Sequence, residues 1–192
     1  MREKESAAAA APEVKEAAVH RGSFDEKAVA GSYESLTRLL IEKELTIATM
    51  ESCTGGEIAT LLTNTEGASA VFRGALIVYC NEAKISLGIP EEVIRENGVY
   101  SPETAAAMAE QCRSRFSTTL SVGVTGTFGN ADPANADSIP GEVYFAIASG
   151  EGTTCYHCTV PFFSARSLAK RYLAEVIATE LREELDIFQR SL

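Results

Sequence analysis

The 192-residue sequence contains no tryptophan, only two histidines, and no apolar run long enough to cross a membrane. A membrane-spanning helix needs about 20 consecutive apolar residues, and a secretory signal needs an apolar core that the N-terminus lacks, so neither is expected. His20 lies in the N-terminal segment and His157 in a strand-like stretch, which disfavours a Ser-His-Asp triad. A nucleophilic serine in this chain would therefore need a different base, and lysine is the candidate.

Basic residues are also scarce, because 17 lysines and arginines face 27 acidic residues and give a formal net charge of −10. A protein with this excess repels phosphate backbones and anionic lipid surfaces. We therefore expect no nucleic-acid partner and no membrane partner. A local cationic pocket for one small phosphate remains compatible with this composition.

The five cysteines are an odd number, scattered through apolar segments. This usage indicates reduced thiols rather than a disulfide framework, and it favours a cytoplasmic protein. Cys155 and Cys158 have the spacing of a metal-binding pair, but no second pair exists and structural zinc normally takes four ligands. We predict neither a metal nor a cofactor.

The length fits one domain with a core of ordinary size. Residues 1–31 are rich in alanine and mixed charges and have few large apolar side chains, so they are expected to form a flexible N-terminal extension. Residues 32–192 are predicted to form the globular domain.

Within this domain, apolar periodicity, capping residues and turn signals predict helices that alternate with strands. Ser32 and Ser101 are the expected N-caps of two of the helices, the second followed by Pro102 at its first position. The predicted sheet is mixed and mainly parallel, and helices on both faces complete a three-layer α/β/α sandwich. Helices are expected after Ser32, at 55–64, 81–88, 90–98 and 101–116, and from Ser164, with strands at 45–50, 70–80, 118–126, 141–149 and, antiparallel, 153–160.

The stretch MESCTGGEIATLL, residues 50–62, lies where a strand meets a helix, which is where α/β sheets usually place their ligands. The N–H groups of Thr54, Gly55 and Gly56 are expected to face the cleft together with the positive end of the helix dipole, a setting that favours an anion or an oxyanion. Two interpretations of Ser52 remain open here: it is a nucleophile, or Ser52 or Thr54 simply caps the helix. Cys53 is either an alternative nucleophile or a buried packing residue.

Lys84 is the candidate base, because it follows an apolar strand by one helical turn at the end of the same sheet. Desolvation lowers the pKa of a lysine toward neutrality, which lets its amine accept a proton. Tyr79 lies five residues earlier. The alternative interpretation of Lys84 is an ordinary solvated surface lysine.

Three motifs carry a resemblance to a known family: E-S-C-T-G-G, then Y-x-N-E-A-K from Tyr79 to Lys84, then G-V-Y-S followed by an A-x-x-M-A helix. From about Leu36 to about Leu185 the sequence resembles the CinA C-terminal domain family, the nicotinamide-nucleotide amidohydrolases. The resemblance implies hydrolysis of the carboxamide of nicotinamide mononucleotide to nicotinate mononucleotide and ammonia. A catalytically silent nucleotide-binding or regulatory member of the fold, and an amidohydrolase for another small amide, remain alternatives.

The resemblance also implies roles for individual residues. Ser52 matches the nucleophile, Lys84 the general base and Tyr79 a tyrosine that assists at the same centre. Arg166 matches an arginine associated with the substrate phosphate. The protein is expected to bind a small pyridine nucleotide and to form a homo-oligomer. The residues expected to bind the nucleotide are Thr54, Gly55, Gly56, Thr125, Gly126, Phe128, Gly129 and Arg166.

One loop departs from the family pattern. Where the family has T-G-I-A-G-P-x-G-G, this chain reads TGTFGNADPANADSIPGEV from Thr125 onward. Phe128 is expected either to stack on a pyridine ring or to fill the place of that ring. Asp132 and Asp137 are expected to repel a phosphate placed nearby, and Ala165 stands where the family has an aspartate before its arginine.

Overall fold

The computed structural model describes residues 11–18 and 24–190. Of the predicted extension, residues 1–10 and 19–23 lie outside the described residues. The described residues form one mixed sheet in the order β1-β6-β5-β4-β2-β3. β2 is parallel to β3 and β4, β1 is parallel to β6, and β5 is antiparallel to both β4 and β6. The strands are β1 (Val14–Glu16), β2 (Ile47–Glu51), β3 (Phe72–Ile77), β4 (Leu120–Gly126), β5 (Glu142–Ala148) and β6 (Thr153–Thr159).

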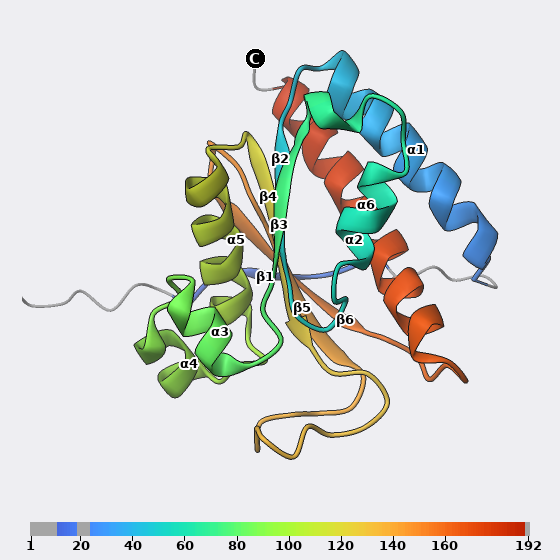
Figure 1. Cartoon of the computed structure of the whole chain (residues 1–192). Helices are drawn as coiled ribbons and strands as arrows, with labels where there is room; N and C mark the ends of the chain where they lie inside the picture. Colours follow the sequence, from blue (N-terminus) through green and yellow to red (C-terminus); the bar gives the residue numbers. More distant parts are fainter. Residues whose placement is uncertain (1–10, 19–23, 191–192) are drawn as a thin grey trace, which may run out of the picture.

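Helices cover both faces of this sheet (Figure 1). One layer contains α1 (Glu26–Glu42), α2 (Glu57–Thr63) and α6 (Arg166–Arg190), and the other contains α3 (Asn81–Ser86), α4 (Glu91–Asn97) and α5 (Pro102–Phe116). A 3-10 turn, Ala68–Ala70, precedes β3. The predicted three-layer α/β architecture with a mixed, mainly parallel sheet is confirmed.

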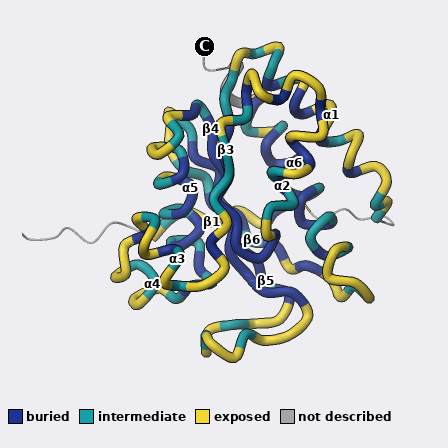
Figure 2. Tube along the Cα trace, in the orientation of Figure 1, coloured by how far each residue is buried: buried dark blue, intermediate teal, exposed yellow. Residues whose placement is uncertain are grey.

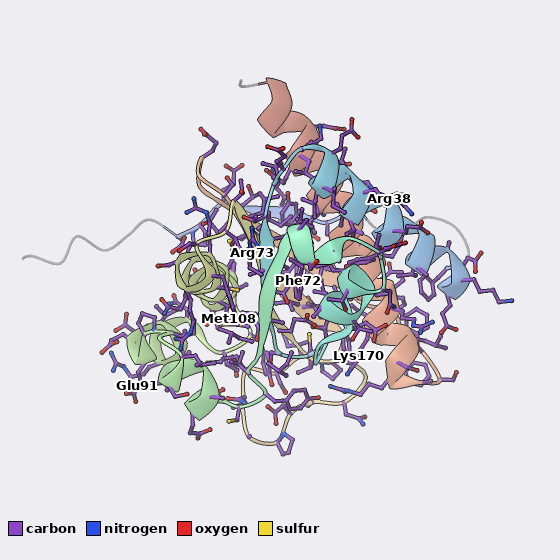
Figure 3. The ribbon with its side chains drawn as sticks, turned by 45° about the horizontal axis from the view of Figure 1, so that its top comes forward. Arg38, Phe72, Arg73, Glu91, Met108 and Lys170 are labelled. Atoms are coloured by element: carbon purple, nitrogen blue, oxygen red, sulfur yellow. The ribbon has the colours of Figure 1, made fainter. Side chains whose placement is uncertain are left out.

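The central strands are buried on both faces, as the dark tube in Figure 2 shows for β4. α5 lies very close to β4, because a Cβ atom on Gly123 would come within 2.4 Å of backbone atoms of Ala105 and Ala109. Glycine on the strand and alanine on the helix make this approach possible. Met108 of α5, labelled in Figure 3, is fully buried and packs in the same cluster as Met50 of β2.

The N-terminal part of the domain differs from the sequence-based expectation. β1 belongs to the segment 1–31, yet it pairs with β6. Lys15 of β1 also forms an ion pair with Glu184 of α6, with 3.5 Å between Nζ and Oε1. α1 begins at Glu26 with Asp25 as its cap, so the prediction of Ser32 as the N-cap is wrong. The helical spacing extends upstream because Val29 is buried in register with the later apolar residues of the helix. The other predicted cap is confirmed, since Ser101 accepts a hydrogen bond from the Thr104 N–H at 3.1 Å.

The carboxyl ends of β2, β3 and β4 lie at the same edge of the sheet because these strands are parallel. β2 leads into the turn at 52–56, β3 into the segment 78–84, and β4 into the long loop 127–141. Figure 1 shows this loop beyond the sheet, with α3 on one side and the start of α6 on the other. The topology thus brings together the segments that contain the predicted site residues.

Candidate active site

Ser52 and Lys84 are in direct contact. Lys84 Nζ donates a hydrogen bond to Ser52 Oγ at 3.2 Å and another to the Val78 carbonyl oxygen at 3.2 Å. Both side chains are buried, with 2% of Lys84 and 6% of Ser52 exposed. The Ser52 N–H donates to the Val124 carbonyl at 3.1 Å, which fixes the serine backbone against β4. The structure therefore rules out the interpretation of Lys84 as a solvated surface lysine.

Burial is the main influence on the charge of Lys84. Desolvation lowers its pKa from the ordinary lysine value, and the effect is opposed by Cys53, Cys80, Asp132 and Glu82. A lysine amine with a lowered pKa is neutral over a wider pH range and can then accept a proton. The serine contact and the burial together give this pair the arrangement that a hydroxyl nucleophile and its base require.

The turn between β2 and α2 is organised by Glu51, a residue to which the sequence analysis assigned no role. Its Oε2 accepts hydrogen bonds from the N–H groups of Gly56 (2.8 Å) and Ile58 (3.3 Å), and its Oε1 accepts from the Ala59 N–H (2.9 Å) and the Thr49 hydroxyl (3.1 Å). The fully buried Glu51 carboxylate, rather than Ser52 or Thr54, therefore caps α2. The cap interpretation of Ser52 is wrong, and its hydroxyl faces Lys84 instead.

This arrangement also changes the expected anion site. The Gly56 N–H is bound by Glu51, and the Gly55 N–H donates to the Ser52 carbonyl oxygen at 3.0 Å. Both glycines have positive φ angles, 59° at Gly55 and 96° at Gly56, so the tight turn requires them. Two of the three N–H groups predicted to meet an anion thus serve the turn itself. The sequence signal for the capping role of Glu51 was an acidic residue directly before a turn that contains two glycines.

A pocket of about 480 Å³ opens over Ser52. Its walls come from the turn after β2, the segment after β3 and the start of α3, the residue Tyr100 just before α5, the loop after β4 and the start of α6. The lining residues are Ser52, Cys53, Tyr79, Cys80, Asn81, Glu82, Tyr100, Gly126, Thr127, Phe128, Asn130, Ala131, Asp132, Ala134, Asn135 and Arg166.

Arg166 lies in the pocket wall together with two aromatic side chains. Its Nη2 donates a hydrogen bond to the Tyr79 hydroxyl at 3.0 Å, and its guanidinium carbon lies 5.2 Å from the centre of the Phe128 ring. Phe128 is only 5% exposed and belongs to the main core cluster. Within the described residues the Tyr79 hydroxyl bonds to Arg166 rather than to Ser52 or Lys84, so its assistance in catalysis stays a prediction.

The divergent loop 127–141 is held by a polar network that sequence reasoning did not find. Asp132 accepts hydrogen bonds from the Tyr100 hydroxyl at 2.6 Å, the Asn135 side chain at 2.7 Å and the Ala134 N–H at 2.9 Å. Asn135 in turn accepts from Asn81, at the start of α3, at 2.8 Å. These contacts connect the loop to the same helix that contains Lys84.

The remaining predicted site residues occupy different places. Gly126 lines the pocket, whereas Thr54, Gly55, Gly56, Thr125 and Gly129 are not among the described residues that form its lining. The Thr125 hydroxyl donates to the Val99 carbonyl oxygen at 2.9 Å inside the core. Burial raises the pKa of the Cys53 thiol to about 12, which favours the packing interpretation of this cysteine over the nucleophilic one.

Cys155 and Cys158 belong to core clusters on opposite faces of the sheet. In the described part of the chain, no group of three or more histidine, cysteine or acidic side chains is arranged to hold a metal ion. Within the same residues, no helix has both the length and the apolar character needed to span a membrane.

The fold and the site define a three-layer α/β domain with a buried serine–lysine pair at the carboxyl ends of parallel strands. Residues 30–184 match the CinA C-terminal domain, and the chain belongs to this family. The family assignment made from the three sequence motifs is confirmed.

Individual relatives agree with this assignment. The chain is 44% identical over 119 residues to a CinA-like protein of Flavobacterium psychrophilum, which covers 61% of the chain and 28% of the relative. It is 36% identical over 156 residues to a CinA-like protein of Chloroherpeton thalassium, which covers 80% of the chain and 37% of the relative. The chain thus spans about a third of the length of these curated relatives.

Solved structures have the same fold. The competence/damage inducible protein CihA from Agrobacterium tumefaciens superposes with a TM-score of 0.68 at 30% identity, covering 81% of this chain and 96% of the other. The competence damage-inducible protein A from Klebsiella pneumoniae superposes with a TM-score of 0.75 at 20% identity, covering 82% and 97%, a similarity that concerns the fold alone.

Proposed function

We propose that this chain hydrolyses the carboxamide of nicotinamide mononucleotide, releasing nicotinate mononucleotide and ammonia, with Ser52 as the nucleophile and Lys84 as the general base. The observation that carries this proposal is the 3.2 Å contact between Lys84 Nζ and Ser52 Oγ, buried next to a pocket of about 480 Å³. Such a volume suits a small molecule of nucleotide size.

In the proposed reaction, the neutral Lys84 amine takes the hydroxyl proton while Ser52 Oγ attacks the carboxamide carbon. The tetrahedral intermediate then collapses, and the proton on Lys84 passes to the departing nitrogen, which leaves as ammonia. A water molecule, deprotonated by the same amine, attacks the resulting ester. This second attack frees the acid product and restores the Ser52 hydroxyl.

The pocket lining supports a phosphorylated ligand with a planar ring. Arg166 supplies a guanidinium, which forms strong bidentate hydrogen bonds with phosphate groups. Tyr79 and Tyr100 supply aromatic surface in the same lining. The Phe128 ring packs near the Arg166 guanidinium, and we propose that it supports this guanidinium rather than the ligand ring.

A catalytically silent nucleotide-binding module is the second candidate. The observation that favours it is the divergent loop, which places the Asp132 carboxylate in the pocket lining. The divergent loop leaves Ser52 and Lys84 in contact, but it changes the shape and charge of the pocket next to them. The third candidate function, hydrolysis of a different small amide, would use the same pair of residues, Ser52 and Lys84.

An ammonia-release assay on the full chain separates these candidates. We expect ammonia from nicotinamide mononucleotide, with nicotinate mononucleotide as the second product by chromatography. Release of ammonia from another amide in a panel of small amides, but not from this nucleotide, would support hydrolysis of a different small amide. Calorimetric binding of the nucleotide with no ammonia from any amide would support the silent module.

A further inference from the structure

The charged side chains of the pocket are unevenly distributed. Among the described residues that line it, three are charged: Glu82, Asp132 and Arg166. Arg166 begins α6, whereas Glu82 belongs to α3, and these helices lie in different layers on either side of the sheet (Figure 1). Asp132 is connected to the α3 side through Asn135 and Asn81. Arg166 therefore belongs to one layer, whereas Glu82 belongs to the other and Asp132 lies in a loop that is hydrogen-bonded to that second layer.

Asp132 is held in place and kept ionised. The Tyr100 hydroxyl, the Asn135 amide and the Ala134 N–H all donate to its carboxylate, and the Tyr100 hydrogen bond lowers its pKa most. Two carboxylate oxygens offer about four acceptor sites, so three donors leave this group able to meet a further partner. Fixed, ionised groups of this kind discriminate between ligands by charge.

The charge balance of the pocket indicates what that partner is. With Lys84 neutral, as a base must be, the charged groups of the lining are two carboxylates and one guanidinium. A phosphate ester adds further negative charge, of which Arg166 compensates a part. A ligand that also carries a positive charge gains an attractive contact with the carboxylate side, while a ligand with a neutral ring does not.

We propose that Asp132 is a specificity-determining residue that selects nucleotides with a permanently cationic ring over nucleotides of the same shape with a neutral ring. This inference rests on the proposed function, whose substrate carries a pyridinium ring, and it assigns the recognition of that positive charge to Asp132. It also explains the acidic residue in the divergent loop. Asp132, which was expected to repel the phosphate, instead attracts the cationic ring at the other end of the ligand.

Calorimetry with two matched ligands tests this proposal. Oxidised and reduced nicotinamide mononucleotide have the same ribose and phosphate, but the oxidised ring is a cation and the reduced dihydropyridine ring is neutral. Titrations into Ser52→Ala measure binding without turnover. We expect tighter binding of the oxidised ligand, and we expect Asp132→Asn in the same background to reduce the preference roughly three- to tenfold.

The chain offers two matched controls. Asp137→Asn removes the same charge from the same loop, but Asp137 accepts from the Tyr100 N–H at 3.2 Å and is not among the described lining residues. Tyr100→Phe removes a hydrogen bond to Asp132 but leaves its charge. Both variants should keep most of the preference for the cation. A preference that survives Asp132→Asn, or one that Asp137→Asn reduces equally, would overturn the proposal.

A second measurement does not depend on the loop variants. In Ser52→Ala the preference for the oxidised ligand should shrink as salt is added, because screening weakens charge–charge contacts. Equal affinity for both ligands at low salt would contradict the proposal. If the wild type hydrolyses the nucleotide but shows no preference for the cationic ring, only this inference is refuted. If the preference exists and depends on Asp132 but the wild type releases no ammonia, only the proposed hydrolysis is refuted.

Discussion

Replacing Lys84 with methionine separates the effect of burying an amine from its role in the reaction. The side chain is 2% exposed, and its two hydrogen-bond partners, Ser52 Oγ and the Val78 carbonyl oxygen, are uncharged. Methionine retains a long, unbranched side chain and removes the charge. We expect Lys84→Met to be more stable than the wild type by about 1–2 kcal/mol at neutral pH. Below the unfolded-state pKa, the buried amine costs free energy either because its charge is desolvated or because it has to give up its proton on folding. For a domain of this size that gain corresponds to roughly 2–8 °C in Tm.

The gain should depend on pH in a defined direction. The folded-state pKa of Lys84 is lowered from 10.5, so between the folded and unfolded values the unfolded chain binds more protons. The wild type therefore becomes more stable as pH rises through this interval. Lys84→Met lacks this dependence, and its advantage should be largest below the folded pKa and shrink toward pH 10.5.

Urea unfolding at a series of pH values measures this difference, and ammonia release measures the second effect. We expect activity to fall by two or more orders of magnitude, as for the loss of a general base. Lys27→Met is the matched control, because Lys27 is exposed and should change neither property. A destabilisation of Lys84→Met that is the same at every pH would contradict the lowered pKa of Lys84. Activity that remains at the wild-type level would contradict its role as the base.

Two further substitutions test residues around this pair. Glu51→Gln leaves one oxygen to serve the donors now shared by two, so unfolding by denaturant should show a loss of about 2–3 kcal/mol. Glu57→Gln, at the first residue of α2 and partly exposed, should lose less than about 1 kcal/mol. Equal losses would remove Glu51 from its capping role. Arg166→Ala should weaken the nucleotide roughly tenfold to a hundredfold in calorimetry but leave its phosphate-free riboside nearly unchanged. Arg171→Ala, whose guanidinium pairs with Glu26, is the control, and equal losses for nucleotide and riboside would exclude a phosphate role for Arg166.

The sequence predicted the layers and most elements of the fold because their signals are local. Apolar periodicity marked the helices, and β-branched runs marked the central strands. β1 was not predicted, since its residues bury little apolar surface and depend on pairing with a distant strand, β6. The start of α1 was placed late because Ser32 is a good capping residue by type, but it lies inside a longer apolar repeat.

The Ser52–Lys84 pair was predicted from the sequence, and the contacts that support it were not. Ser52 and Lys84 belong to recognisable motifs, and the parallel strands bring the ends of those motifs together. Glu51 was missed because a buried carboxylate that accepts three N–H groups gives no periodic signal. The network of Asp132 with Tyr100 depends on how a long loop folds back, which turn composition alone does not specify.

Ammonia release from nicotinamide mononucleotide by three proteins, the wild type, Ser52→Ala and Cys53→Ala, shows directly which side chain is the nucleophile. The two adjacent residues are the competing nucleophiles, and both line the pocket. We expect turnover by the wild type and by Cys53→Ala, and none above background by Ser52→Ala. Wild-type turnover by Ser52→Ala, particularly with loss of activity in Cys53→Ala, would contradict the role of Ser52 as the nucleophile.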